Sequence, residues 1–229
     1  MKQKFTILFD LDGTLVDTAP DLMLAHNHVM KKFGYPTKST EDIRNLVGKG
    51  AGALIGRSIW GQAKKEFSKV LDAKIKDEMV KEFVNFYGKN IVNESTLITG
   101  VKEFLIWCKE QNISMAVCTN KQEHLSNDLL KKIGIYDFFE YVAGSDTFDY
   151  CKPDPRHLTN VVEILDGDVK KTIMIGDSET DANAAKEAEI PMILLKYGYT
   201  EKRSEEIYHN HLIKDFIGVE KIVSTYLKD

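Results

Sequence analysis

Phe9-Asp10-Leu11-Asp12-Gly13-Thr14 places two acidic side chains at the end of a short apolar run and follows them with a turn. The run, residues 5–11, is rich in aromatic and β-branched residues and too short for a typical helix, so we predict a buried strand that breaks at Gly13. Side chains two apart on a strand face the same way, which brings Asp10 and Asp12 within a few ångströms of each other. Two ionised carboxylates that close repel unless a cation lies between them or one carries a proton. A turn needs only one Asp, so the pair indicates a functional site.

The composition bounds the class of protein. The chain has 229 residues, 43% of them hydrophobic and 29% charged, which is enough for one large domain or a core with a smaller second domain. A formal net charge of -4 and the lack of a basic cluster give no reason to expect nucleic acid or a membrane as a partner. Three cysteines without CxxC spacing, and an N-terminal segment unlike a signal peptide, lead us to expect a cytoplasmic protein.

The segment from Val16 to Ser95 shows helical patterns and no strand-like alternation. Apolar residues recur at helical spacing from Pro20 to Phe33, and Ser39 to Asp42 resembles a capping box that opens a short helix. Further helices are expected over 53–59, 63–71 and 77–91. We therefore expect an all-helical cap domain at 16–95, inserted into a catalytic core made of 1–15 and 96–229.

From Gly100 onward, strand and helix patterns alternate. Strands are expected over 113–118, 141–142, 172–175 and 190–195, and helices over 101–109, 123–133, 155–165, 181–188 and 216–227. Alternation of this kind predicts an α/β fold in which a parallel sheet is covered by helices on both faces.

Polar residues follow the carboxyl ends of three expected strands. These are the pair Asp10 and Asp12, the triplet Thr119-Asn120-Lys121, and the triplet Gly176-Asp177-Ser178. Lys152 lies in the loop after the weak strand at 141–142. Ligands of parallel sheets bind at this edge, so we expect these groups to converge on one crevice.

The acidic residues suit a hard divalent cation such as Mg²⁺, which prefers oxygen ligands. Asp10, Asp177 and a backbone carbonyl near Asp12 supply candidate ligands. Asp181 follows Asp177 at i, i+4 spacing and is placed to order the water around the ion or to orient Lys152.

A carboxylate nucleophile, a metal ion and an anion site together describe phosphoryl transfer through an aspartyl phosphate. Asp10 would attack phosphorus, and Asp12 would act as general acid and then general base. Thr119 and Asn120, at a strand-to-helix junction, and Lys152 would hold the phosphate oxygens.

Four motifs, in this order, resemble those of the haloacid dehalogenase-like hydrolase superfamily: DLDGTLVD at 10–17, CTNK at 118–121, KPDP at 152–155 and GDSETD at 176–181. The resemblance implies a Rossmann-like core, Mg²⁺ and a mobile cap. It also implies Asp10 as nucleophile, Asp12 as acid/base, Thr119 and Lys152 on phosphate, and Asp177 on the metal, with Asp181 assisting. DTAPDL at 17–22 and LVGKGA at 46–51 are similar to the phosphoglycolate phosphatases of that superfamily, which implies 2-phosphoglycolate as the substrate.

The glycine-rich loop from Gly48 to Gly52 carries Lys49 and is the expected source of specificity, because a flexible loop can bring a lysine to a substrate carboxylate. A helix end with a solvated lysine explains the same residues equally well.

Other functions share much of this machinery. A broad-specificity sugar-phosphate or nucleotide phosphatase, a pyrophosphatase and a phosphomutase would use the same groups. A receiver-like phosphorylation switch would be a binding module and normally lacks a large helical insertion. A haloalkanoic acid dehalogenase would need neither Asp12 nor a metal nor a phosphate site. The sequence leaves open whether the protein is a monomer or a dimer.

Overall fold

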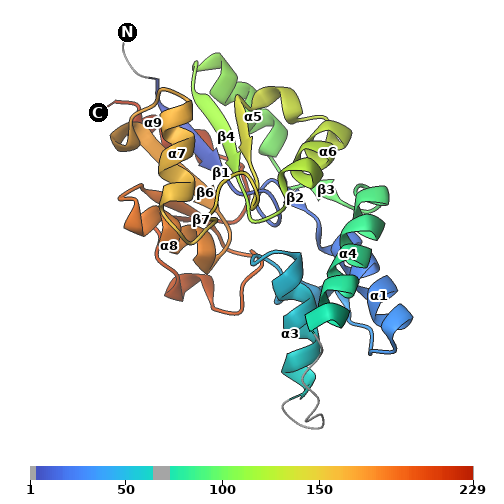
Figure 1. Ribbon diagram of the computed structural model, residues 1–229. Coiled ribbons are helices and arrows are strands. Elements are labelled where there is room, and N and C mark those ends of the chain that lie inside the picture. Colours follow the sequence, from blue (N-terminus) through green and yellow to red (C-terminus); the bar gives the residue numbers. More distant parts are fainter. Residues whose placement is uncertain (1–3, 64–72, 229) are drawn as a thin grey trace.

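A six-stranded parallel sheet forms the centre of the computed structural model, which describes residues 4–63 and 73–228 (Figure 1). Its strand order is β5-β4-β1-β6-β7-β8. The strands are β1 Thr6–Phe9, β4 Ser114–Cys118, β5 Tyr141–Ala143, β6 Thr172–Gly176, β7 Met192–Leu195 and β8 His211–Ile213. The register pairs Phe9 with Val117 on one side and with Ile175 on the other, so these three strands end level with one another. The predicted α/β fold is confirmed.

Helices cover both faces of the sheet, so every residue of β1 is buried. Its alternate side chains enter opposite layers. Ile7 and Phe9 pack in one layer with α5 Val101–Glu110, α6 Glu123–Ile133 and α9 Val219–Tyr226. Leu8 packs in the other layer with α7 Arg156–Ile164 and α8 Glu179–Glu187. The sequence pattern does not predict β8, because this edge strand has only three residues and two of them are half-buried.

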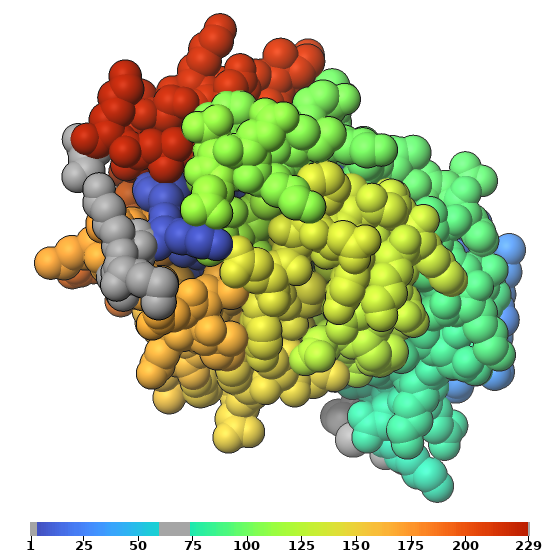
Figure 2. Space-filling view, turned by 90° about the horizontal axis from the view of Figure 1, so that it is seen from above, coloured from blue at the N-terminus to red at the C-terminus, as the bar shows by residue number. Residues whose placement is uncertain are grey.

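A group of helices lies to one side of the carboxyl edge of the sheet (Figure 1): α1 Ala19–Phe33, α2 Thr40–Arg44, α3 Ala51–Ala63 and α4 Ala73–Lys89. The predicted capping box is confirmed, since the Ser39 and Asp42 side chains each accept a hydrogen bond from the other residue's backbone. In Figure 2 the teal atoms of α4 adjoin the yellow-green atoms of α6, where Gly88 approaches Leu125. The helix predicted over 63–71 falls almost wholly outside the described residues. In the described part of the chain, no helix is both long and apolar enough to cross a membrane.

The chain enters and leaves this helical segment through a small antiparallel ribbon. Strand β2 Val16–Asp17 pairs with β3 Thr96–Leu97, which corrects the expectation that the segment from Val16 contains no strand. Strands of two residues are too short to show alternation, and they form because the two crossing segments satisfy each other's backbone groups. The boundaries predicted at 15/16 and 95/96 fall at this ribbon, and their role as domain boundaries stays a prediction.

Asp21, in the first turn of α1, fixes the segment that returns from α4 to the ribbon. Its buried carboxylate accepts hydrogen bonds from the backbone N–H groups of Asn93, Glu94 and Ser95 and from the Ser95 hydroxyl, at 2.6–3.2 Å. A carboxylate that accepts several N–H bonds replaces the water that those groups lose on burial.

We predict that Asp21→Ala lowers the free energy of unfolding by about 3 kcal/mol, because it leaves several buried donors without an acceptor. Urea unfolding measures the change. Asp128→Ala, at an exposed position of α6, is the matched control and should change stability by less than about 0.5 kcal/mol. Equal effects of the two substitutions would contradict the role assigned to Asp21.

Candidate active site

A buried lysine lies between two carboxylates at the carboxyl edge of the sheet. Lys152 Nζ is 2.9 Å from Asp10 Oδ1 and 2.5 Å from Asp181 Oδ1. Asp177 completes the cluster, since Asp10, Asp177 and Asp181 each offer an oxygen within 4.8 Å of the others. All four residues are buried. The cluster thus holds three carboxyl groups and one ammonium group, so its acids outnumber its positive charges.

Local structure fixes the orientation of Asp181. Its Oδ2 accepts hydrogen bonds from the N–H groups of Asp177 and Ser178 and from the Ser178 hydroxyl, in the capping box that begins α8. A side chain on Gly176 would fall 2.6 Å from the Asp181 Cβ, so the end of β6 must be glycine for this approach. One oxygen of Asp181 therefore starts the helix, and the other holds Lys152.

Asp177 is held from the opposite side by the loop after β7. Its Oδ2 accepts a hydrogen bond of 2.6 Å from the backbone N–H of Tyr199. Burial, and then the charges of Asp10 and Asp181, hold the pKa of Asp177 well above its usual range.

Burial and the charge of Lys152 shift the pKa of Asp10 in opposite directions. Burial raises its pKa to about 6, against the lowering effect of the Lys152 ammonium group. The two carboxylates of Asp181 and Asp10 outweigh desolvation at Lys152 and raise the lysine's pKa. Oxygen donors that repel one another in a buried site are the donor set that fits a hard divalent cation.

Asp12 is not a member of this cluster and has its own cation. Lys121 Nζ is 2.7 Å from both carboxylate oxygens of Asp12, and the Thr18 hydroxyl donates a further hydrogen bond of 2.7 Å to Oδ1. The Lys121 ammonium also lies 4.6 Å from the ring centroid of Tyr87, on α4. The pair is nearly buried, so Asp10 and Asp12 are each neutralised by a different lysine.

The residues after β4 bridge several loops. The N–H of Thr119 donates to the carbonyl of Ala143, and the Thr119 hydroxyl accepts from the N–H of Lys121 and can still donate its own hydrogen. Asn120 Nδ2 donates to the carbonyls of Gly48 and Lys152, at 3.2 and 2.9 Å. Helix α6 begins only at Glu123, so an anion would meet the Thr119 hydroxyl and not a helix N-terminus at this point.

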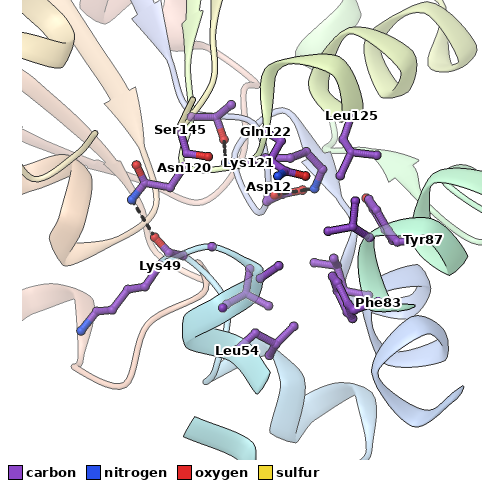
Figure 3. Close-up of a pocket in the computed structure, with 18 of the residues that line it drawn as sticks. Asp12, Lys49, Leu54, Phe83, Tyr87, Asn120, Lys121, Gln122, Leu125 and Ser145 are labelled. Atoms are coloured by element: carbon purple, nitrogen blue, oxygen red, sulfur yellow. Dashed lines mark hydrogen bonds and ion pairs between the residues drawn. The ribbon is translucent and has the colours of Figure 1, made fainter. Parts of the chain in front are cut away.

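A cavity of about 250 Å³ opens between these loops and the helical segment. Asp10, Asp12, Thr119 and Asn120 line it, whereas Lys152, Asp177 and Asp181 lie outside its lining. The helical segment adds an apolar wall that includes Leu22, Leu54, Val80, Phe83, Val84, Tyr87, and α6 adds Leu125. Figure 3 shows this wall facing Asp12 and Lys121. Lys49 also lines the cavity, but its side chain is exposed and its ammonium group points away from Asp12 (Figure 3).

The sequence predictions place Lys121 at this edge of the sheet without its pairing to Asp12, and they miss Tyr199 and Tyr87. Lys121 belongs to a recognised motif, but its pairing with Asp12 is not visible in the sequence. Tyr199 lies in the loop after β7, and its position after the carboxyl end of a strand is the one signal in the sequence that points to it. Tyr87 comes from a helix far away in the sequence, and no sequence signal marks it.

Comparison with known proteins agrees with this geometry. Residues 7–195 match the family model described as haloacid dehalogenase-like hydrolase. A phosphoglycolate phosphatase of Caulobacter vibrioides is 40% identical over 222 residues, which cover 97% of this chain and 92% of the relative. A crystal structure described as a predicted phosphoglycolate phosphatase from Haemophilus somnus 129PT has a TM-score of 0.89 at 31% identity, covering 97% of this chain and 99% of that one. A β-phosphoglucomutase of Clostridium difficile, at 22% identity, 98% coverage of both chains and a TM-score of 0.77, shares the fold.

We predict that Gly13→Ala disrupts the acidic cluster. Gly13 has φ of +80°, and an added Cβ would fall 2.2 Å from Asp177 Oδ2, which the Tyr199 N–H holds in place. The substitution should lower the free energy of unfolding, measured in urea, by at least about 2 kcal/mol more than the strain of the left-handed backbone alone would.

Gly34→Ala provides the matched control. Gly34 has φ of +77°, but nothing lies within 4 Å of the added Cβ, so this substitution should cost only about 1–2 kcal/mol. If Gly13→Ala is no more destabilising than Gly34→Ala, the close approach of Gly13 to Asp177 is not a constraint on the site.

Proposed function

Because the chain belongs to the haloacid dehalogenase-like hydrolases, we propose that it is a Mg²⁺-dependent phosphatase that hydrolyses 2-phosphoglycolate through a phosphorylated Asp10. The observation that carries the proposal is the position of Asp10. It directly follows strand β1, borders the cavity, contacts the buried Lys152, and lies within 4.8 Å of oxygens of Asp177 and Asp181.

Asp10 is the nucleophile in this mechanism. One of its oxygens accepts from Lys152, and the other, which accepts no hydrogen bond from a side chain of the described residues, attacks phosphorus in line with the leaving oxygen. Lys152 neutralises charge on the phosphoryl oxygens as the bond to Asp10 forms. The Thr119 hydroxyl, on the neighbouring strand end, donates a hydrogen bond to the same group.

Asp12 moves the protons. It lines the same cavity as Asp10, and the proposed mechanism places the leaving oxygen beside it. As general acid it protonates that oxygen, and as general base it then takes a proton from the water that hydrolyses the phosphorylated Asp10. The hydrogen bonds from Thr18 and Lys121 hold its carboxylate in place for both steps.

A divalent ion fits the residues around Asp10. Asp10, Asp177 and the backbone carbonyl of Asp12 would hold Mg²⁺, and Asp181 would orient Lys152 from behind. When bound, the ion offsets the mutual repulsion of these acids and the charge of the phosphate oxygens.

Two observations support 2-phosphoglycolate as the substrate. Relatives named phosphoglycolate phosphatase are 33–40% identical to this chain and match most of it. A cavity of about 250 Å³ is smaller than the range of about 300–1,000 Å³ typical of larger ligands, which favours a small ester over a nucleotide. A contact between Lys49 and the substrate stays a prediction and requires the side chain to turn inward. The three cysteines are free, which suits the cytoplasmic location predicted from the sequence.

We predict Mg²⁺-dependent phosphate release from 2-phosphoglycolate, faster than from sugar phosphates, nucleotides or pyrophosphate. Asp10→Asn should reduce kcat by at least about a thousandfold, because the amide is a poor nucleophile. Thermal melting checks that this variant is folded. Equal turnover of all the esters would show a phosphatase of broad specificity and would contradict the proposed substrate. Full activity of Asp10→Asn would refute the mechanism.

We also predict that Mg²⁺ stabilises the protein more as the pH rises. The pKa of Asp10, about 6 in the metal-free fold, is above its ordinary value of 3.8, so the folded protein holds this proton more tightly than the unfolded chain. Its contribution to metal-free stability is therefore present below pH 3.8 and is lost as the pH rises through 6. Mg²⁺ competes with the same proton.

The measurement is the rise in Tm on adding Mg²⁺ at pH 5 and at pH 7.5. The rise should be clearly larger at pH 7.5, and the difference should shrink in Asp10→Asn, whose side chain does not titrate. A Tm rise of the same size at both pH values would show that Mg²⁺ binds without displacing protons from the cluster.

A further inference from the structure

We propose that Lys121 binds the carboxylate of the substrate and so selects small phosphate esters that carry an acid group next to the phosphate. This inference rests on the proposed phosphatase activity and names the residue that recognises the rest of the substrate. The hydrolytic machinery around Asp10 treats all phosphate esters alike, so selection must come from the cavity beyond it.

Lys121 is a buried cation on the wall of the cavity. It lies beside the acid/base residue, since its Nζ is 2.7 Å from both oxygens of Asp12. In 2-phosphoglycolate one carbon separates the ester oxygen from the carboxylate group. When Asp12 faces the ester oxygen, the carboxylate can therefore reach only a cation next to Asp12, and Lys121 is in that position.

An ammonium group has three N–H donors, and Asp12 takes two of those of Lys121. The third is available to a ligand in the cavity. Tyr87 also lines the cavity, and its buried hydroxyl has no hydrogen-bond partner within the described residues, so we count it as a second candidate donor. Burial, and then the charges of Asp12 and Asp21, raise the pKa of Tyr87, which keeps this hydroxyl protonated.

The backbone of Lys121 is held rigidly, as a selective contact requires. Its N–H donates to the Thr119 hydroxyl, and its carbonyl accepts from the N–H of Ser145 at 2.9 Å. A Cβ on Gly144 would fall 2.7 Å from the same carbonyl, so the loop after β5 presses closely on this turn. Figure 3 shows Ser145, Lys121 and Asp12 joined in this order.

The rest of the described lining offers a carboxylate no other buried cation. The wall from the helical segment is apolar, and of the lysines and arginines in the described lining only Lys49 and Lys121 are present. The Lys49 ammonium is exposed to solvent and directed away from Asp12 (Figure 3). Water screens the charge of a buried ammonium group less than that of an exposed one.

The test compares 2-phosphoglycolate with ethyl phosphate, a two-carbon ester without the carboxylate. The quantity measured is the ratio of kcat/KM for the two esters, which does not depend on how much of a variant is folded. Lys121→Met should lower this ratio by about 10-fold to 100-fold, because a hydrogen bond to a charged partner is lost only with 2-phosphoglycolate. Lys121→Arg should restore part of it.

The outcomes separate this inference from the proposed function. If the wild-type ratio is near one, the proposed substrate is wrong. If the wild-type ratio is high but Lys121→Met lowers both kcat/KM values equally, Lys121 acts only through Asp12 and the inference is overturned. If Lys49→Met lowers the ratio and Lys121→Met does not, the carboxylate contact belongs to Lys49.

Calorimetry keeps the inference testable if Lys121→Met is inactive toward both esters. Binding of 2-phosphoglycolate to Asp10→Asn protein, with and without the second substitution Lys121→Met, needs no turnover. The double variant should bind 2-phosphoglycolate about 10-fold to 100-fold more weakly and ethyl phosphate about as well. Equal losses for both ligands would contradict the proposal.

Discussion

The Lys152 ammonium group, buried between Asp10 and Asp181, is the contact on which the site depends. Burying three carboxylates around one cation is costly, and the fold offsets that cost with hydrogen bonds from the start of α8 and from the Tyr199 N–H. What remains is a local excess of negative charge. A metal ion and the lysine together would balance it, and the proposed mechanism uses Asp10 both as a ligand of that ion and as the nucleophile.

The helical segment is connected to this cluster by polar contacts. Arg44, on α2, lies 2.6 Å from the carboxylate of Asp17 in the ribbon, and its guanidinium is 5.5 Å from the ring centroid of Tyr199. The Tyr199 hydroxyl donates to Asp17 at 2.6 Å and accepts from the N–H of Ala19, while its backbone N–H holds Asp177. One residue thus contacts the ribbon, the first helix and an acid of the buried cluster. A change in the position of the helices would therefore reach Asp177 directly.

The sequence predicts the part of the site that strand ends determine. Asp10 and Asp177 follow apolar runs, and the sheet pairs those runs in register, so their convergence follows from the alternating pattern. Lys121 and Tyr87 are different, because their contact depends on how α4 packs beside α6, and side-chain packing between distant segments leaves no periodic signal. The ribbon and β8 escape prediction for a simpler reason, since strands of two or three residues are too short to show a pattern.

The central claim is that Asp10 becomes phosphorylated during turnover. Rapid acid quenching of the Mg²⁺-loaded protein with 2-phosphoglycolate, followed by peptide mass mapping, tests it most directly. One phosphoryl group should be found on the peptide that contains Asp10, and Asp10→Asn protein should carry none. A phosphoryl group on another residue, or its persistence in Asp10→Asn, would contradict the assignment of the nucleophile.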